Sequence, residues 1–328
     1  MSIYKGSQKI KDIYKGSTKI GKVYKGSTLV YQSKNPMFYA LGQFDTSSYT
    51  VQDYAYSSNG TSWTKGTLPF KAGWDFYKGF ASGNGKIVII PLRDKNNSFA
   101  YSTDGINWTK GTMPTTAWWN AVTFGNGKFV AVVNNSNIFA YSTNGTSWTK
   151  GTLPASNYWS EVTYGNGKFV AFAGNQNSNV FAYSTDGINW TKGTMPSSDA
   201  WNLCTFGNGK FVAVVAASNV FAYSTDGINW TKGTLPASLI WQNLVYGNGK
   251  FVAFAGATTS LSATTDYAYS SNGTSWTKGT TPVACGAIAY GNGKFIGVTG
   301  TTAIYSTDGI NWTKGTLSTY LSSIAYAE

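Results

Sequence analysis

The sequence has no histidine and a single arginine, Arg93, among its 328 residues. Without histidine the chain cannot build a Ser-His-Asp triad, a Cys-His pair or a histidine-ligated metal site. Carboxylates remain as a route to catalysis, acting as general acid and nucleophile. Four of the thirteen acidic residues recur in a repeated turn, and the others show no recurring position or close pair. We therefore expect a protein that is not an enzyme and that holds no metal or cofactor.

Cysteine and long apolar segments are also scarce. Cys204 and Cys285 occupy different repeats and different repeat positions, which excludes a disulfide scaffold and predicts two free thiols. The first residues, MSIYKGSQKIKD, lack the apolar stretch of a signal peptide, and no run of eighteen apolar residues occurs. We expect neither a cleaved leader nor membrane insertion.

Glycine and aromatic residues are abundant. The chain contains 38 glycines, 16% aromatic residues and only 12% charged residues. Short runs rich in Val, Tyr, Phe and Thr, separated by Gly, Asn and Ser, are typical of an all-β protein with many tight turns. The net charge of +12 comes largely from lysines in two repeated tetrapeptides, Trp-Thr-Lys-Gly and Gly-Asn-Gly-Lys. This pattern favours a solvated rim over a nucleic-acid surface, so no nucleic-acid partner is expected.

Two markers recur at intervals of about forty residues and define an internal repeat. A Ser-(Thr/Ser)-(Asp/Asn)-Gly-(Ile/Thr)-(Asn/Ser)-Trp motif occurs seven times, and Gly-Asn-Gly-Lys occurs six times. One complete unit predicts four strands, at residues 159–164, 168–173, 180–184 and 190–193. Asn-Gly and Asp-Gly pairs suit the tight turns between these strands. Four-stranded units in series predict a β-propeller.

The two ends of the repeat array complement each other. The first unit lacks its first strand, because Met37–Leu41 already matches the second strand at Lys128–Val132. The chain ends on Leu321–Tyr326, which matches the first strand at Trp159–Tyr164. We therefore predict an all-β fold in which residues 34–328 form a seven-bladed β-propeller of four-stranded blades, closed by the C-terminal strand.

A different, ten-residue repeat fills the N-terminal segment, residues 1–33. Its units centre on Tyr-Lys-Gly-Ser at Tyr4, Tyr14 and Tyr24, and they alternate apolar and polar residues around a Gly-Ser turn. Such units suit very short strands or hairpins but are too short and basic to bury a core alone. We expect an attachment or oligomerisation segment.

The Trp-containing marker resembles the Asp-box of sialidase-like (BNR-repeat) propellers, although it is one residue shorter than that family's usual box. The resemblance implies a structural hairpin in which Ser102 and Asp104 bind turn amides and Trp108 packs between strands. Three boxes carry Asn in place of Asp, which suits a role in folding better than one in chemistry. Sialidases hold the substrate carboxylate with three arginines, and this chain has one.

The pattern from Tyr14 to Ile20 resembles segments of tail and baseplate proteins from phages of Gram-positive bacteria. This resemblance implies a virion tail protein made without a signal peptide and acting at the host cell surface. Other tail or baseplate proteins would then be partners of residues 1–33, and a homotrimer is one assembly that the segment would allow.

The two ends of the blades are expected to differ. The Gly-Asn-Gly and Asp-Gly turns share one face and are nearly constant, whereas the loops on the opposite face vary between repeats. Variable loops on a rigid scaffold are where binding residues usually lie. Aromatic rings can stack on sugars, so the candidate ligand-binding residues are the aromatics predicted on this variable face. They are Trp74, Tyr77, Trp118, Trp119, Tyr158, Trp159, Trp201 and Trp241. The alternative is that these aromatics plug the channel mouth or pack between blades.

The leading functional hypothesis is a lectin-like, phage-tail-type receptor-binding protein that recognises host cell-surface glycan, or less readily a surface protein, through the variable face. One alternative is a structural tail component that docks another virion protein. A second is a glycan-cleaving, sialidase-like enzyme that uses Glu161, Asp199 or Asp75.

Overall fold

The computed structural model describes residues 37–41, 51–72, 78–91, 95–174, 178–256 and 264–327, together with short strands between residues 4 and 32. All of the regular structure in these parts is β-strand, with no helix, and hence with no helix able to cross a membrane. The chain divides into two compact units, Met1–Pro36 with Glu328 and Met37–Ala327.

The first unit contains three antiparallel hairpins, in agreement with the expectation from the ten-residue repeat. The paired strands are β1 (Tyr4–Lys5) with β2 (Gln8–Lys9), β3 (Tyr14–Lys15) with β4 (Thr18–Lys19), and β5 (Lys22–Lys25) with β6 (Thr28–Gln32).

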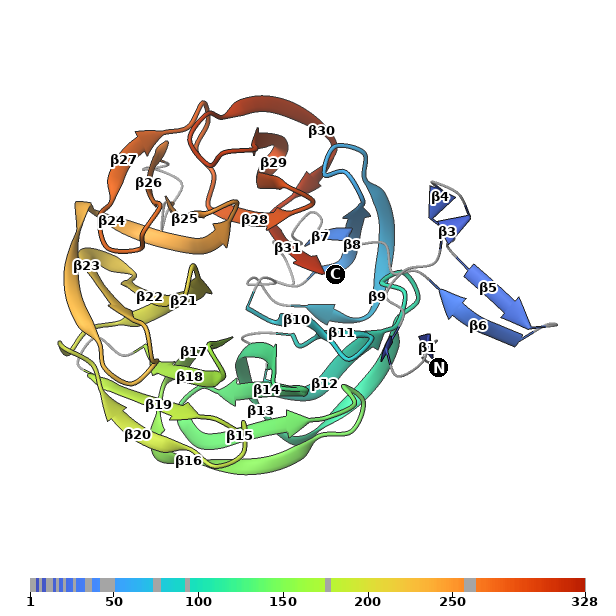
Figure 1. The fold of residues 1–328 in the computed structure, drawn as a ribbon, viewed down its shortest axis with the longest axis horizontal. Helices are drawn as coiled ribbons and strands as arrows, with labels where there is room; N and C mark the ends of the chain where they lie inside the picture. The colour runs from blue at the N-terminus through green and yellow to red at the C-terminus, as the bar shows by residue number, and fades with distance from the viewer. Residues whose placement is uncertain are drawn as a thin grey trace. The chain divides into compact units, whose positions relative to one another are not determined.

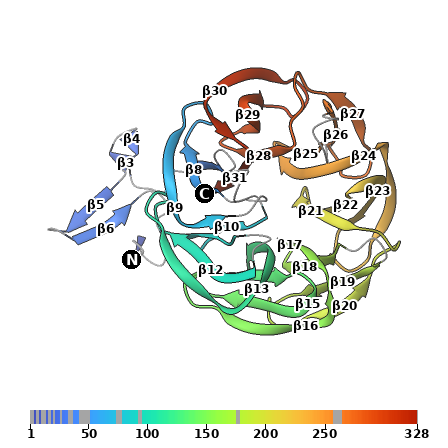
Figure 2. The same cartoon turned by 180° about the vertical axis from the view of Figure 1, so that it is seen from behind.

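The second unit is a series of antiparallel sheets arranged around a common centre, as in a β-propeller (Figures 1 and 2). Short inner strands lie towards the centre, and long strands such as β16 and β30 lie at the outside (Figure 1). The strands in the first half are β7 (Met37–Leu41), β8 (Val51–Ser57), β9 (Thr64–Ala72), β10 (Phe80–Gly83), β11 (Lys86–Ile89), β12 (Lys95–Ser102), β13 (Thr109–Gly125), β14 (Lys128–Val133), β15 (Ser136–Ser142), β16 (Thr149–Asn157), β17 (Trp159–Gly165), β18 (Lys168–Ala173), β19 (Val180–Ser184) and β20 (Thr191–Thr194). Those in the second half are β21 (Trp201–Gly207), β22 (Lys210–Val215), β23 (Ala217–Ser224), β24 (Thr231–Gly247), β25 (Lys250–Ala255), β26 (Asp266–Ser270), β27 (Thr277–Thr280), β28 (Ala287–Gly291), β29 (Lys294–Ser306), β30 (Thr313–Leu321) and β31 (Ser323–Ala327).

The strand count per sheet departs from four because some strands are continuous. The first part of β13 pairs with β12 and its last part pairs with β14, so this strand ends one repeat and begins the next. β24 does the same between β23 and β25, and the result is two seven-stranded sheets. In the sheet β28-β29-β30, β29 combines the expected second and third strands. Only a short bend around Gly300, at φ 60°, separates the two pairing segments.

The hairpin turns have the backbone conformation that the Asn-Gly pairs predict. In the turn before β14, Asn126 has φ 42° and Gly127 has φ 73°, and both values are positive as a tight hairpin of this kind requires. The Asn126 side chain also donates a hydrogen bond to the carbonyl of Thr185 in the following repeat, at 3.1 Å. The same residue therefore forms the turn and connects two neighbouring repeats.

The Ser-Thr-Asp-Gly turn is closed by its own side chains. The Ser102 hydroxyl accepts a hydrogen bond from the Gly105 amide at 2.8 Å, and Asp104 accepts bonds from the amides of Ile106 and Asn107. Burial alone would raise the pKa of Asp104, but these hydrogen bonds outweigh it and lower the pKa to about 2. Where Asn144 replaces the aspartate, its side-chain oxygen accepts the equivalent two amide bonds, each at 2.9 Å. The turn is thus structural in both forms.

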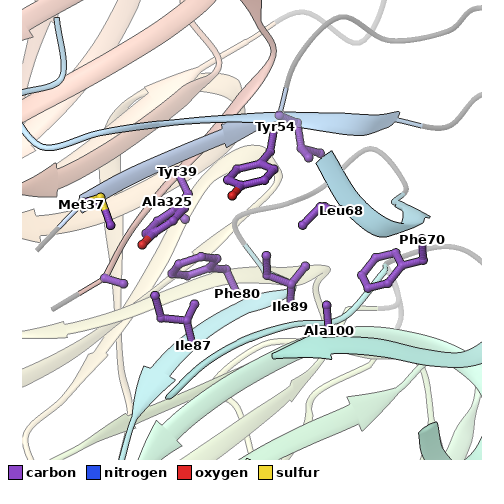
Figure 3. Packing of buried hydrophobic residues seen from close by; sticks show 12 residues of the cluster. Met37, Tyr39, Tyr54, Leu68, Phe70, Phe80, Ile87, Ile89, Ala100 and Ala325 are labelled. Carbon is purple, nitrogen blue, oxygen red and sulfur yellow. The ribbon is translucent and has the colours of Figure 1, made fainter. Parts of the chain in front are cut away.

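The C-terminal strand pairs with the first strand of this unit. β31 lies antiparallel to β7 in a sheet of order β31-β7-β8-β9, with Ser323 opposite Leu41 and Ala327 opposite Met37. Ala325 contributes to a core shared with Met37 and with residues of β8 to β12 (Figure 3). The Asn292 side chain donates to the Ser58 carbonyl at 2.7 Å, which is the bond that Asn126 makes between consecutive repeats. The two ends of the repeat array are therefore joined by pairing, packing and hydrogen bonding.

Candidate functional site: the centre of the propeller

Four of the predicted ligand-binding tryptophans are core residues. Trp119, Trp159, Trp201 and Trp241 begin the inner strand segments and are between 0 and 2% exposed. The indole N–H of Trp241 donates to the Ser218 carbonyl at 2.8 Å. A ring with almost no accessible surface cannot stack on a ligand without repacking, so the prediction was wrong for these four. They follow the alternative interpretation, packing between sheets.

The remaining predicted aromatics divide into two pairs. Trp74 and Tyr77 lie outside the described residues. Trp118 is 46% exposed, and the Lys95 ammonium lies 6.0 Å from the centre of its ring. Tyr158 is half-buried. Trp118 and Tyr158 therefore stay predictions, with Trp118 the better placed for contact with a ligand.

Polar residues follow the tryptophan position in the inner strands. In the four repeats with a tryptophan, the pairing register shifts at this second position, for example between Trp119 and Ala121. Some of these side chains connect neighbouring sheets: Asn120 donates to the Trp159 carbonyl at 3.0 Å, and Ser160 donates to the Trp201 carbonyl at 2.9 Å. The polar residues at this position are Lys78, Asn120, Ser160, Asn202, Gln242 and Ser322.

A cavity of about 480 Å³, here called the mouth cavity, opens beside several of these residues. Lys78, Asn202 and Gln242 line it from the inner strand positions. Tyr320, which is 43% exposed, adds an aromatic ring from the end of β30. Other walls come from Ala216, between β22 and β23, and from Thr299–Gly300 within β29.

A second cavity of about 290 Å³, here called the inner cavity, shares Lys78 and Leu203 with the mouth cavity. Its polar lining includes Glu161, Cys204 and Asn243, whereas most of its other walls are apolar or aromatic. The two cavities together place a small set of charged and amide groups at the centre of the propeller.

An ion pair lines the inner cavity, and its cation also lines the mouth cavity. The Lys78 ammonium is 3.6 Å from the Glu161 carboxylate, and each side chain is 12% exposed. Lys78 also donates to the carbonyls of Asn202 at 2.6 Å and Ser160 at 3.3 Å, so it spans from the chain before β10 to β17 and β21. Burial raises the pKa of Glu161 to about 7, against the attraction of Lys78 and a bond from the Val162 amide. This carboxyl changes its charge near neutral pH.

The two cysteines are free thiols, as predicted. Burial raises the pKa of Cys204 well above its usual value, and the negative charge of Glu161 adds to the effect. Burial also raises the pKa of Cys285 to about 12. Both thiols are therefore protonated and poor nucleophiles at neutral pH. In the part of the chain that the structure describes, no three Cys, Asp or Glu residues come together in a metal-binding group.

Sequence reasoning missed most residues of the two cavities. Lys78, Asn243 and Tyr320 were not singled out, and Glu161 was considered only as a catalytic acid. One signal was available, because aligning the repeats on the tryptophan places a polar residue next to it in six of them. Two residues after the tryptophan position, most repeats carry a small or apolar residue. Glu161 and Asn243 are larger polar residues at this position, which distinguishes them in the sequence.

No protein-family model and no curated protein matches the chain. Solved structures do match. A streptogramin B lyase aligns over 80% of this chain and 90% of its own, with a TM-score of 0.62 and 15% identity. Virginiamycin B lyase from Staphylococcus aureus aligns over 74% and 85%, with a TM-score of 0.62 and 16% identity. YCF48 bound to a D1 peptide aligns over 74% and 82%, with a TM-score of 0.57 and 15% identity. At these identities the likeness shows the fold, and the second unit is a β-propeller.

The lyases correct one expectation from the sequence. We expected that the chain is not an enzyme, but propellers of this architecture include the streptogramin B lyases, so the fold is compatible with catalysis. A catalytically inactive virginiamycin B lyase carries alanine in place of a histidine, and this chain contains no histidine. At 15–16% identity the likeness shows the fold alone.

Proposed function

We propose that the second unit is a closed, seven-bladed propeller and that the chain is a phage-tail-type receptor-binding protein for host cell-surface glycan. The seven Trp-containing markers support the blade count. The pairing of β31 with β7 and the bond from Asn292 to Ser58 support closure. Residues 1–33 would attach the propeller to other tail proteins, on the basis of their resemblance to tail and baseplate segments.

The mouth cavity is the observation that carries the glycan proposal. Sugars present hydroxyl groups at the edge of the ring and C–H groups on its faces. A site for them combines amide or hydroxyl side chains with an accessible aromatic ring. Asn202 and Gln242 supply amides, Ser322 supplies a hydroxyl, and Tyr320 supplies the ring. All four lie at or next to the starts of inner strand segments, at positions whose residues differ between repeats.

Binding of purified host-wall polysaccharide, measured by calorimetry or on a glycan array, tests this proposal. Tyr320→Ala should weaken binding by about 10-fold or more, because loss of an aromatic contact costs on the order of 1–3 kcal/mol in such sites. Trp118→Ala tests a remaining sequence candidate in parallel, because this ring is about as exposed as Tyr320 but does not line the mouth cavity. Equal losses of glycan affinity in both variants would mean that the glycan contacts more of the variable face than the mouth cavity. No binding to any envelope fraction would refute the proposal.

Removing residues 1–33 separates receptor binding from the rival role of docking another virion protein. A receptor-binding propeller should keep its affinity for the host surface without this segment, provided that its melting temperature is unchanged. Because one similar propeller is recorded with a bound peptide, the assay should include a host surface-protein fraction beside the polysaccharide. Binding of the protein fraction alone would replace the glycan in the proposal.

A further inference from the structure

The inner cavity has the properties of a small-molecule site that the glycan proposal does not use. Its volume of about 290 Å³ lies at the lower end of the range for small-molecule sites, about 300–1,000 Å³. Apolar side chains such as Leu244 and Ile288 form much of the wall, and a few polar groups converge on the space. A ligand of one sugar ring or less would fit this size, whereas a polymer would not.

Asn243 provides a hydrogen-bond donor without a partner. Its side chain is 3% exposed on β24, and its Nδ2 atom has no hydrogen-bond partner among the described residues. Buried amide groups are nearly always paired, and an unpaired one costs about 1–3 kcal/mol. Because Asn243 lines the inner cavity, an acceptor atom placed there would satisfy it.

The charges around the cavity are balanced in its present state. Lys78 is the cation among the described lining residues and Glu161 is the anion. The other titratable groups that line this space are the Cys204 thiol, whose pKa is raised by burial, and the phenols of Tyr246, Tyr290 and Tyr326. A second anion would leave an uncompensated negative charge in a poorly solvated site, which is costly. Protonation of Glu161 would remove that cost. The free energy of this protonation at neutral pH is small, because burial raises the pKa of Glu161 to about 7.

We propose that the inner cavity binds a small carboxylate, held by the Lys78 ammonium and the Asn243 amide and taken up together with one proton onto Glu161. The ligand stays ionised, the proton comes from solvent, and the net charge of the cavity does not change. The carboxylate belongs either to a sugar acid or to a simple small acid, and the probes below separate the two. This inference does not depend on glycan binding at the mouth cavity.

Titration of the full-length protein with glucuronate, acetate and glucose between pH 5.5 and 8.5, followed by NMR or calorimetry, tests the proposal. At least one carboxylate should bind and glucose should not. The dissociation constant should be nearly constant below pH 7 and rise about tenfold per pH unit above it, as uptake of one proton requires. Glu161→Gln should abolish this pH dependence. Binding of glucuronate alone would assign the site to sugar acids, and equal binding of acetate would assign it to small acids.

Asn243→Leu is the critical variant, because it removes the unpaired Nδ2 donor and replaces the side chain with one of similar size. It should weaken carboxylate binding by about tenfold, the value of a hydrogen bond to a charged group. Ser323→Ala is the matched control: Ser323 is also 3% exposed with an unpaired hydroxyl among the described residues, but it lines the mouth cavity. Absence of carboxylate binding, binding independent of pH, or equal binding by Asn243→Leu would overturn the proposal. Tyr320→Ala should leave carboxylate binding unchanged, which separates this site from the mouth cavity.

Discussion

The stability of the propeller should depend on pH through Glu161. The folded-state pKa of this carboxyl is raised from 4.5 to about 7, so the folded chain binds a proton more tightly than the unfolded chain between these values. Stability from this group is therefore fully present below about pH 4.5 and is lost as pH rises through about 7. At about 1.4 kcal/mol per pKa unit, the loss amounts to about 3 kcal/mol.

Denaturant unfolding of the wild type and Glu161→Gln, at half-unit steps from pH 4.5 to 8, measures this loss. The readout is how the difference in unfolding free energy between wild type and Glu161→Gln changes with pH. Its absolute value is not used, because the substitution also leaves Lys78 without its anionic partner. Asp266→Asn, which breaks an ion pair with Lys278 of 2.9 Å at a more exposed place, is the control and should keep the wild-type slope. A difference that stays flat across this range would refute the account of Glu161 as a buried, weakly compensated carboxyl.

Three further predictions concern packing and closure, each measured as the free energy of unfolding. Trp159→Ala should cost about 3–5 kcal/mol, because the ring is fully buried. Gly125→Ala should cost about 1–3 kcal/mol, since a Cβ atom there would collide with the ring of Tyr164. Gly127→Ala should cost less, because its Cβ would meet nothing within 4 Å and only the positive φ opposes it. Asn292→Ala should cost about 1–2 kcal/mol, because it removes the bond to the Ser58 carbonyl and the bond from the Tyr326 hydroxyl, and a neutral result would count against closure by these bonds.

Local sequence signals predicted the strands and turns well, because these depend on neighbouring residues. The Asn126–Gly127 pair predicted a turn that requires positive φ, and the structure has it. The pairing of the C-terminal strand with β7 was also predictable, since the count of strand motifs left one partner missing at each end. Continuity of β13 from one sheet into the next was missed, because Pro114 and the polar residues after it are typical of a loop.

The site was harder to predict, because it depends on which side chains meet across the centre. A tryptophan that recurs at one repeat position is compatible with a ligand platform and with a core contact, and only the burial of Trp159 distinguishes them. Lys78 contacts the carbonyls of Ser160 and Asn202, which lie 82 and 124 residues away. No periodicity in the sequence encodes such a contact, since Lys78 occurs in a single repeat.

The most direct test of the account is a crystal structure of the chain soaked with oligosaccharides from the host wall. The account predicts a sugar in the mouth cavity, with one ring face against Tyr320 and hydroxyl groups at the amides of Asn202 and Gln242. Sugar bound only outside this cavity, or a cavity that stays unoccupied while the same oligosaccharide binds the protein in solution, would contradict it.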